Sequence, residues 1–234
     1  DDDLGTASDD VVGCDTNLNF GYTYNSTNND GIYGSAPPAV GFDFFRGAAV
    51  QTGVHTDSIS YYSPPGSNNY IVKHGFKDIG LTVFNYYNNG NPPPSDPLTN
   101  TETYRVLVGK WRTGDSWINP LNGDTAIKCF SGDPVAGTGW LQPGQNDRRF
   151  IQWTGPFTMN PGDTQNIVVA QVIARCSSNI QSVKSLRSTD ALAQRIFDAN
   201  FQVPPPAPVV PTNVYAPGNG KIYISWSDTA EKIL

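Results

Sequence analysis

Residues 165–174 read QNIVVAQVIA, a continuous run of apolar and β-branched residues that predicts a strand buried in a protein core. Shortly after it, residues 180–200 read IQSVKSLRSTDALAQRIFDAN, with apolar residues at helical spacing and Arg and Gln on the other face. This second segment predicts a helix that Ser177 or Ser178 caps and that packs on one face of a β-sheet. A strand followed by a packing helix is therefore the expected frame of the fold.

Upstream of this frame, the chain consists of short strand-like segments separated by turn residues. It contains 23 Gly and 19 Pro, which favour turns and disfavour long helices. The strand-like segments are 39–45, 48–50, 58–62, 70–72, 80–87, 125–130, 149–153 and 155–159, whereas 101–111 fits either a strand or a helix. The sequence predicts a mainly β fold, a β-sandwich-like domain with one packed C-terminal helix.

Residues 204–211 read PPPAPVVP, a stiff proline-rich linker that predicts a domain boundary. It separates a β-rich domain at 1–203 from residues 212–234, where two alternating segments flank a Pro-Gly-Asn-Gly turn and predict a hairpin. This tail resembles the opening strands of an Ig-like fibronectin type III domain, with Trp226 at the core tryptophan position. Because so short a segment cannot complete a sandwich of about 100 residues, we expect an incomplete module or a hairpin that borrows its core from a neighbour.

Charge and hydropathy exclude two classes of partner. The chain has 15 Lys and Arg against 21 Asp and Glu, a net charge of −6, so no basic surplus exists to neutralise nucleic-acid phosphates. No run of 18 apolar residues occurs, so no helical membrane insertion is expected. A composition rich in Asn, Ser, Thr and Tyr with few charges is typical of extracellular or cell-surface proteins.

Hard oxygen ligands gather near the N-terminus and predict a calcium site. Asp9 and Asp10 lie in an acidic segment, and Asn25 and Asp30 follow in an Asn-rich loop that Gly31 closes. Calcium takes six to eight such oxygens on a flexible loop, and it would offset the repulsion between neighbouring carboxylates. The alternative is a solvated acidic end followed by an ordinary Asn-rich turn.

A paired aromatic and amide segment predicts a glycan-binding surface. Tyr86 and Tyr87 are followed directly by Asn88 and Asn89, and Trp111 lies further along the chain. Aromatic faces stack on sugar rings, and amides bond their hydroxyl groups. The alternative is that the paired aromatic residues alternate between the core and the surface of a strand.

The sequence offers no constellation of catalytic residues, and we expect a protein that is not an enzyme. Only His55 and His74 are candidate histidine bases, and neither lies in a nucleophile or metalloprotease motif. Glycosidases need two paired carboxylates, but nothing in the sequence selects a pair from the many Asp residues in turns.

Two further groups predict structural contacts. Asp147, Arg148 and Arg149 are expected to form an ion pair that ties a loop to the sheet, with anion binding as the alternative. Cys129 and Cys176 both end strand-like runs and are the predicted disulfide, which leaves Cys14 as a buried free thiol.

The order of several short motifs resembles a recurring region of large secreted proteins from Bacteroidota and relatives such as Ignavibacteria. The motifs lie at 9–15 (DDVVGCD), 24–25 (YN), 36–41 (APPAVG), 44–47 (FFRG), 86–89 (YYNN), 131–134 (SGDP), 147–150 (DRRF), 155–158 (GPFT) and 193–198 (AQxxFD). Proteins of this type carry fibronectin type III repeats and a C-terminal sorting domain for type IX secretion. The resemblance covers roughly 1–203 and implies export, without implying a known reaction.

These observations favour a secreted structural or adhesive protein of the cell surface, a subunit of an extracellular assembly or fibre. Its expected partners are other copies of itself or other surface proteins. The alternative is a glycan-binding accessory module of a large surface protein, with a polysaccharide as ligand. A third interpretation is an Asp-dependent hydrolase, which needs two carboxylates in a cleft and a raised pKa on one of them.

Overall fold

The computed structural model describes residues 4–90, 94–202 and 213–226. The fold is mainly β and sandwich-like, as the sequence predicts. The chain divides into two compact units, 1–201 and 202–234. The predicted linker at 204–211 lies outside the described residues. Neither helix in the described part of the chain has the length and apolar character needed to cross a bilayer.

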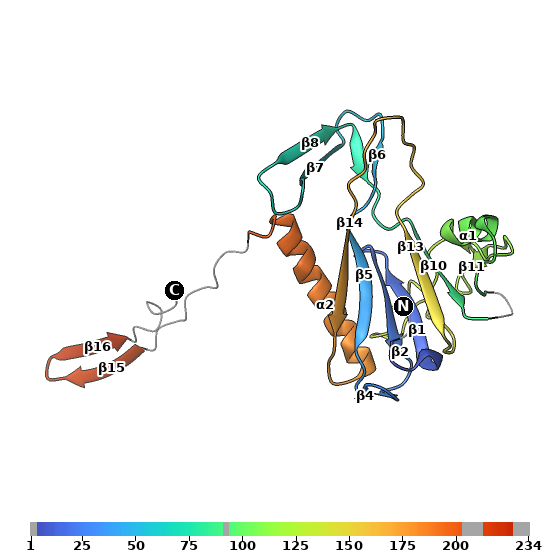
Figure 1. Ribbon diagram of the computed structural model, residues 1–234. Coiled ribbons are helices and arrows are strands. Elements are labelled where there is room, and N and C mark those ends of the chain that lie inside the picture. The colour runs from blue at the N-terminus through green and yellow to red at the C-terminus, as the bar shows by residue number, and fades with distance from the viewer. Residues whose placement is uncertain (1–3, 91–93, 203–212, 227–234) are drawn as a thin grey trace. The chain divides into compact units, whose positions relative to one another are not determined.

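A four-stranded antiparallel sheet, called the main sheet below, is the frame of the first unit (Figure 1). Its strands, in spatial order, are β1 (Asp10–Asp15), β2 (Phe20–Asn25), β5 (Ala39–Arg46) and β14 (Val168–Ala174). The first three strands all lie within residues 10–46, whereas β14 comes from a distant segment and pairs with β5 at the edge of the sheet.

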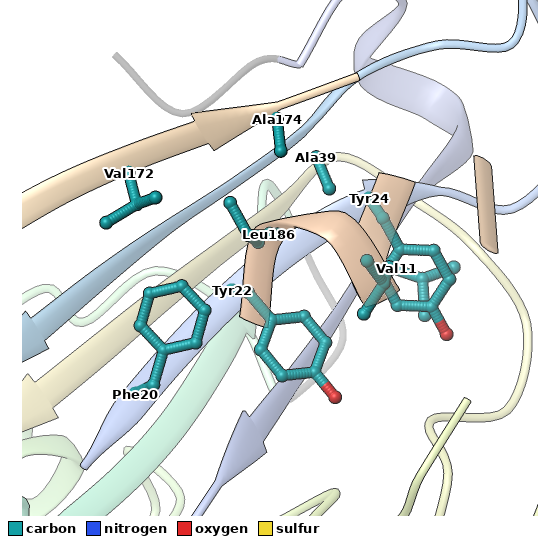
Figure 2. Packing of buried hydrophobic residues seen from close by; sticks show 9 residues of the cluster. Val11, Phe20, Tyr22, Tyr24, Ala39, Val172, Ala174 and Leu186 are labelled. Atoms are coloured by element: carbon teal, nitrogen blue, oxygen red, sulfur yellow. The ribbon is translucent and has the colours of Figure 1, made fainter. Parts of the chain in front are cut away.

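Helix α2 (Asn179–Asp198) covers one face of the main sheet, as its amphipathic pattern predicts. It begins at Ser178, whose side chain accepts a hydrogen bond from the backbone N–H of Gln181 at 3.1 Å. Figure 2 shows the cluster of buried side chains between helix and sheet. The cluster consists of Val11, Phe20, Tyr22, Tyr24, Ala39, Val172, Ala174, Val183 and Leu186.

Two antiparallel strands, β10 (Val83–Asn88) and β13 (Arg148–Trp153), lie over the opposite face of the main sheet. Gly21 of β2 marks the close approach, because a Cβ at this position would lie 2.6 Å from the Phe84 ring. A second buried cluster fills this side and consists of Val12, Cys14, Leu81, Phe84, Tyr86, Trp117, Cys129, Phe130 and Trp140. The two layers of strands form the sandwich.

The remaining elements are short. They are the 3-10 helix η1 (Ala7–Asp9), β3 (Asn29–Asp30), β4 (Gly34–Ser35), β6 (Ala49–Gln51), β7 (Ser58–Tyr62), β8 (Tyr70–His74), β9 (Phe76–Asp78), α1 (Asn100–Leu107), β11 (Trp117–Ile118) and β12 (Thr125–Ala126). Strands β3–β4, β6–β9, β7–β8 and β11–β12 pair as separate two-stranded sheets. The ambiguous segment 101–111 is helical where α1 lies, because Thr99 caps it and accepts a hydrogen bond from Glu102 N–H at 3.2 Å.

One strand prediction is wrong and another is confirmed only in part. Residues 155–159 form no strand, and Pro156 within them lacks the N–H that a ladder requires. The segment 125–130 pairs with β11 only over Thr125–Ala126.

The apolar run at 165–174 predicts a strand buried in the core, but only one face of β14 is buried. Val172 and Ala174 face α2 and are buried, but Val169 and Ile173 on the other face are 52% and 62% exposed. The reason is the position of β14 at the sheet edge, where α2 covers one face and β10–β13 do not reach the other. Val169 and Ile173 on this open face line a cavity.

The second unit contains the predicted hairpin. Strands β15 (Asn213–Gly218) and β16 (Lys221–Trp226) pair in an antiparallel register. All six residues of β16 are exposed, including Ile222, Ile224 and Trp226, which share one face because they alternate along the strand.

Candidate functional site

A groove lies on the half of the main sheet that β10 and β13 leave uncovered. Strand alternation turns Val40, Phe42 and Phe44 of β5 toward this groove, and their neighbours on β5 face α2. The cavity has a volume of about 860 Å³. We call it the sheet groove and define it by Val40, Phe42, Phe44, Tyr87, Arg148, Arg149, Phe150, Gln152, Val169, Gln171 and Ile173.

The floor and wall of the sheet groove are aromatic with a few fixed polar groups. The rings of Phe42 on β5 and Phe150 on β13 lie 6.0 Å apart between their centroids, which joins the two layers. Gln152 donates a hydrogen bond from its Nε2 to the Phe42 carbonyl at 2.9 Å. The groove therefore combines ring faces with amide and guanidinium groups on rigid strands.

Arg148 lies at one end of the sheet groove and is only 7% exposed. Its Nη1 donates a hydrogen bond to Oδ1 of Asn88, and its guanidinium lies 5.1 Å from the centre of the Tyr86 ring. Its Nε–H is buried, and no group of the described residues accepts a hydrogen bond from it. Burial lowers the pKa of Arg148, and the side chain of Tyr86, which forms a hydrogen bond with the guanidinium, opposes this effect only in part.

The predicted ion pair holds for Asp147 and Arg149 and is wrong for Arg148. Arg149 contacts Asp96 with 2.7 Å between Nη1 and Oδ1, and Asp147 with 3.9 Å between Nη2 and Oδ1. Adjacent residues of β13 point to opposite faces, so Arg148 turns toward the main sheet and away from these acids. Asp96 was missed because it lies far away in the sequence.

The predicted glycan-binding residues are divided between core and groove. Tyr86 is buried and stacks on Trp117 with 5.3 Å between ring centroids, so it offers no sugar platform. Trp111 also packs on Trp117, at 5.0 Å. Tyr87, the outward neighbour of Tyr86, does line the sheet groove.

The two predicted amides act on protein groups. Asn88 accepts the hydrogen bond from Arg148, and Asn89 donates from Nδ2 to Oδ2 of Asp147 at 2.7 Å. The aromatic floor on β5 was not among the predicted sugar-binding residues. The sequence signal for this floor is the alternation of Phe42 and Phe44 within the predicted strand at 39–45.

The four predicted calcium ligands do come together, at the end of the main sheet where β1 begins and β2 ends. Asn25 is fully buried, and its Nδ2 lies 2.8 Å from Oδ1 of Asp9 and 3.3 Å from Oδ2 of Asp30. Asp10 is also buried and accepts a hydrogen bond from Leu4 N–H at 3.4 Å. Burial raises the pKa of Asp9, in spite of the hydrogen bond from Asn25.

Backbone N–H groups of the protein already bond one of the four candidate calcium ligands, Asp30. Asp30 accepts backbone N–H groups from Thr6 at 2.8 Å, Ile32 at 2.8 Å and Tyr33 at 2.6 Å. These bonds outweigh the effect of burial and lower the pKa of Asp30 to about 2. Within residues 4–90, 94–202 and 213–226, no group of three His, Cys, Asp or Glu side chains is placed to hold a metal. Calcium binding stays a prediction.

A buried carboxyl pair that sequence reasoning missed lies between β5 and α2. Asp43 and Asp190 are each 1% exposed, and their carboxyl groups lie within hydrogen-bonding reach of each other. Burial, with the charge of the partner, raises the pKa of Asp43 to about 8, and burial raises that of Asp190 to about 6. Its position in the helix could have indicated that Asp190 is buried, because Asp190 lies one turn after the core residue Leu186 on the apolar face.

This pair meets the carboxylate requirement of the hydrolase interpretation, but it lies beneath the helix. The neighbouring cavity of about 570 Å³ is lined by further polar groups, including Asn19, Asp78 and Asp198. A substrate bond would have to reach carboxyl groups that are almost completely covered. We therefore interpret Asp43 and Asp190 as a structural pair that shares a proton.

The predicted disulfide is wrong. Cys129 lies in the second buried cluster beside Cys14, whose Sγ is 3.4 Å from the Cys129 carbonyl oxygen. Cys176 is exposed after the end of β14, and all three cysteines are free thiols. Burial raises the pKa of Cys14 to about 12, so this thiol is protonated at neutral pH.

Comparison with known proteins adds no constraint on this site. No protein-family model, no curated protein and no solved structure matches the chain. The functional argument consequently rests on the geometry of the sheet groove.

Proposed function

We propose that this chain is an adhesive, glycan-binding module of a secreted cell-surface protein, with the ligand held in the sheet groove. One observation carries the proposal. The β10–β13 layer covers only part of the main sheet and leaves an aromatic, partly polar groove of about 860 Å³ over β5 and β14. Cavities that bind small ligands fall in the range of about 300–1,000 Å³ and combine apolar walls with a few polar groups.

The lining has the chemistry that a sugar chain requires. Ring faces of Phe42, Phe44 and Tyr87 suit the apolar C–H faces of pyranose rings. Gln171, which is exposed in the lining, supplies an amide that can bond hydroxyls. From Val40 to Phe44 the floor extends about 13 Å at strand geometry, which accommodates a short oligosaccharide.

The wider context of the proposal comes from composition. A low-charge surface rich in turn residues supports an extracellular location, and the resemblance stated above supports export. In this proposal the module binds without catalysis, and calcium at the N-terminal cluster would have a structural role. Its partners are polysaccharides and other surface proteins.

The test is a binding screen against a panel of neutral and acidic polysaccharides by affinity gel electrophoresis. We expect retardation of the wild-type protein by at least one polymer, and its loss in Phe44→Ala and Ile173→Ala. Leu121→Ala is the matched control, because Leu121 is an exposed apolar residue outside the groove. Melting temperatures of all variants establish that they are folded. Equal mobility in every gel contradicts the proposal.

A second candidate function is a structural subunit of an extracellular assembly. The observation that favours it is the exposed apolar face of β16, with Ile222, Ile224 and Trp226. A two-stranded hairpin is marginal alone, and strand addition to a neighbour is a common route to assembly. Negative-stain imaging of native material tests this candidate. Ordered fibres or sheets support it, and dispersed monomers contradict it.

A further inference from the structure

We propose that the protein has a second sugar-binding site, which takes a neutral polysaccharide and lies between the β7–β8 hairpin and the C-terminal end of α2. This inference rests on the proposed glycan-binding function and adds to it a second site with a defined class of ligand. The cavity has a volume of about 510 Å³, within the range of about 300–1,000 Å³ that is typical of ligand sites. We call it the hairpin pocket, and the part of its lining that is at least partly exposed includes Arg46, Ser60, Tyr61, Tyr62, Tyr70 and Asp198.

Two asparagines hold the hairpin against the rest of the first unit. Asn200, which follows α2, accepts a hydrogen bond from Gly66 N–H at 2.6 Å and donates one to the Ser67 carbonyl at 2.8 Å (Figure 1). Asn166 donates a hydrogen bond to the Ser63 hydroxyl at 2.9 Å. The pocket is therefore formed before a ligand arrives, which reduces the entropy that binding would cost.

Two tyrosines form an open aromatic corner in the hairpin pocket. Tyr62 on β7 and Tyr70 on β8 pair across the hairpin, with 4.9 Å between their ring centroids and 52° between their ring planes. Tyr70 is 55% exposed, so much of its ring is accessible to a ligand. Such a ring packs on the apolar C–H face of a pyranose.

A free acceptor and free donors lie in the same lining. Asp198 accepts a hydrogen bond from Gln194 at 2.7 Å through Oδ1, and no described residue donates to its Oδ2. Arg46 donates from Nη1 to Oδ1 of Asn166 at 3.1 Å. No described residue accepts a hydrogen bond from its Nε or Nη2, and neither of these atoms is fully covered by the protein. A sugar hydroxyl both donates and accepts, so neighbouring hydroxyls satisfy both kinds of group.

Ring contacts fix the guanidinium of Arg46 and leave its N–H groups available. Its Cζ lies 4.3 Å from the centre of the Tyr61 ring and 5.3 Å from the centre of the Phe197 ring. Because guanidinium N–H groups lie in the plane of the group, contacts of this kind against its face do not use them. Arg46 can therefore bond a ligand without a change of position.

The charges in the lining of the pocket select against an acidic sugar. Asp78 and Asp198 contribute two negative charges, and Arg46 contributes one positive charge. Asp78 lies close enough to Arg46 to oppose, together with Tyr61, the lowering of its pKa by burial. A carboxylate or sulfate on a ligand would therefore meet a net negative charge, and the pocket favours a neutral sugar.

The hairpin pocket and the sheet groove lie on opposite sides of β5. Phe44 lines the sheet groove, whereas its neighbour Phe45 lines the hairpin pocket and packs on Phe197 with 5.3 Å between ring centroids. Two sites on one rigid strand allow the protein to bridge two polysaccharide chains, and joint binding raises the apparent affinity above that of either site. This is a property that an adhesive module requires.

The experiment is affinity gel electrophoresis of the full chain in gels that contain laminarin, mannan, hydroxyethylcellulose or alginate, with a polymer-free gel as reference. We expect at least one of the three neutral polymers to retard the wild-type protein. Tyr70→Ala and Asp198→Ala should each weaken this retardation about tenfold, the effect of one lost contact, because retention depends on both sites together. Tyr104→Ala and Asp124→Ala remove the same side chains from exposed positions outside both cavities and should leave it unchanged.

Each outcome has a distinct meaning. Wild-type retardation in Tyr70→Ala and Asp198→Ala, with loss in Phe44→Ala, overturns this inference and leaves the proposed function intact. Loss in Tyr70→Ala with full retardation of Phe44→Ala supports the hairpin pocket and contradicts the sheet groove. Alginate bound through Tyr70 as tightly as the neutral polymers overturns the neutral class of ligand. Retardation by none of the polymers overturns the inference together with the proposed function.

A measurement on the wild-type protein covers the case in which the variants lose stability. Tetranitromethane nitrates accessible tyrosines, and mass mapping of peptides locates the products. The neutral polymer that retards the protein, at saturation, should protect Tyr70 from nitration severalfold and leave Tyr104 unprotected. Equal nitration of Tyr70 with and without the polymer contradicts a sugar in the hairpin pocket.

Discussion

Replacement of Asp43 by Asn should remove a marked pH dependence from the stability of the first unit. In the wild-type protein, Asp43 on β5 and Asp190 on α2 are almost completely buried and face each other. The raised pKa of Asp43, about 8, means that the folded pair keeps a proton at neutral pH. In Asp43→Asn, an amide N–H takes the place of that shared proton permanently.

The magnitude follows from proton linkage. The unfolded chain has both carboxyls ionised above about pH 5, whereas the folded pair holds one extra proton until about pH 8. The free energy of unfolding therefore falls by about 1.36 kcal/mol per pH unit in this window. Between pH 6.0 and 7.5 the wild-type protein should lose about 2 kcal/mol through Asp43, and the variant should lose much less, because only Asp190 is left to titrate at this site.

The assay is urea unfolding followed by tryptophan fluorescence at pH 6.0, 6.5, 7.0 and 7.5, for wild type and variant. The quantity compared is the change in unfolding free energy with pH, so a uniform destabilisation of the variant does not affect the result. Asp124→Asn, which replaces an exposed carboxylate, is the control and should keep the wild-type slope.

Two results would refute the reasoning. Equal slopes for wild type and Asp43→Asn would show that the pair does not retain a proton when folded. A wild-type stability that rises from pH 6.0 to 7.5 would give the sign of a carboxylate stabilised in its charged form, which is opposite to the effect of burial.

Three further predictions concern packing, thiols and calcium. Gly21→Ala should destabilise the fold by about 1–3 kcal/mol in urea titrations, because its Cβ would overlap Phe84; an unchanged midpoint would contradict the close approach. Cys176 should react with a thiol reagent within minutes, while Cys14 and Cys129 react only on unfolding, as intact mass would show. Calcium should raise the melting temperature above that in chelator if the N-terminal cluster binds it, and coincident curves would reject the calcium site.

Local patterns predicted the frame of the fold well. The helix at 180–200 is found as α2 at Asn179–Asp198, since both its apolar stripe and its serine cap are properties of neighbouring residues. The hairpin around the Pro-Gly-Asn-Gly turn is found for the same reason.

Features that depend on distant partners were not predicted. The run at 165–174 gave β14 correctly, but an apolar strand looks the same in sequence whether one or both of its faces are covered. Tyr86 is buried in the core, whereas its neighbour Tyr87 lines the groove. Only the register with β13 decides which of the two is buried. The four candidate calcium ligands were brought together as expected, whereas Cys129 lies beside Cys14 because of a pairing that no spacing reveals.

The order of strands in the main sheet has a consequence for how such a protein varies. Arg46 on β5 pairs with Val168 on β14, 122 positions later (168 − 46). The sheet and its helix are thus built from the two ends of the first unit, and the β10–β13 wall belongs to one long intervening segment. The entropy of closing such a segment grows slowly, by about 0.6 kcal/mol for each doubling of length. Insertions within it can therefore reshape one wall of the groove while the floor on β5 and β14 stays in place, so ligand preference is free to diversify on an unchanged scaffold.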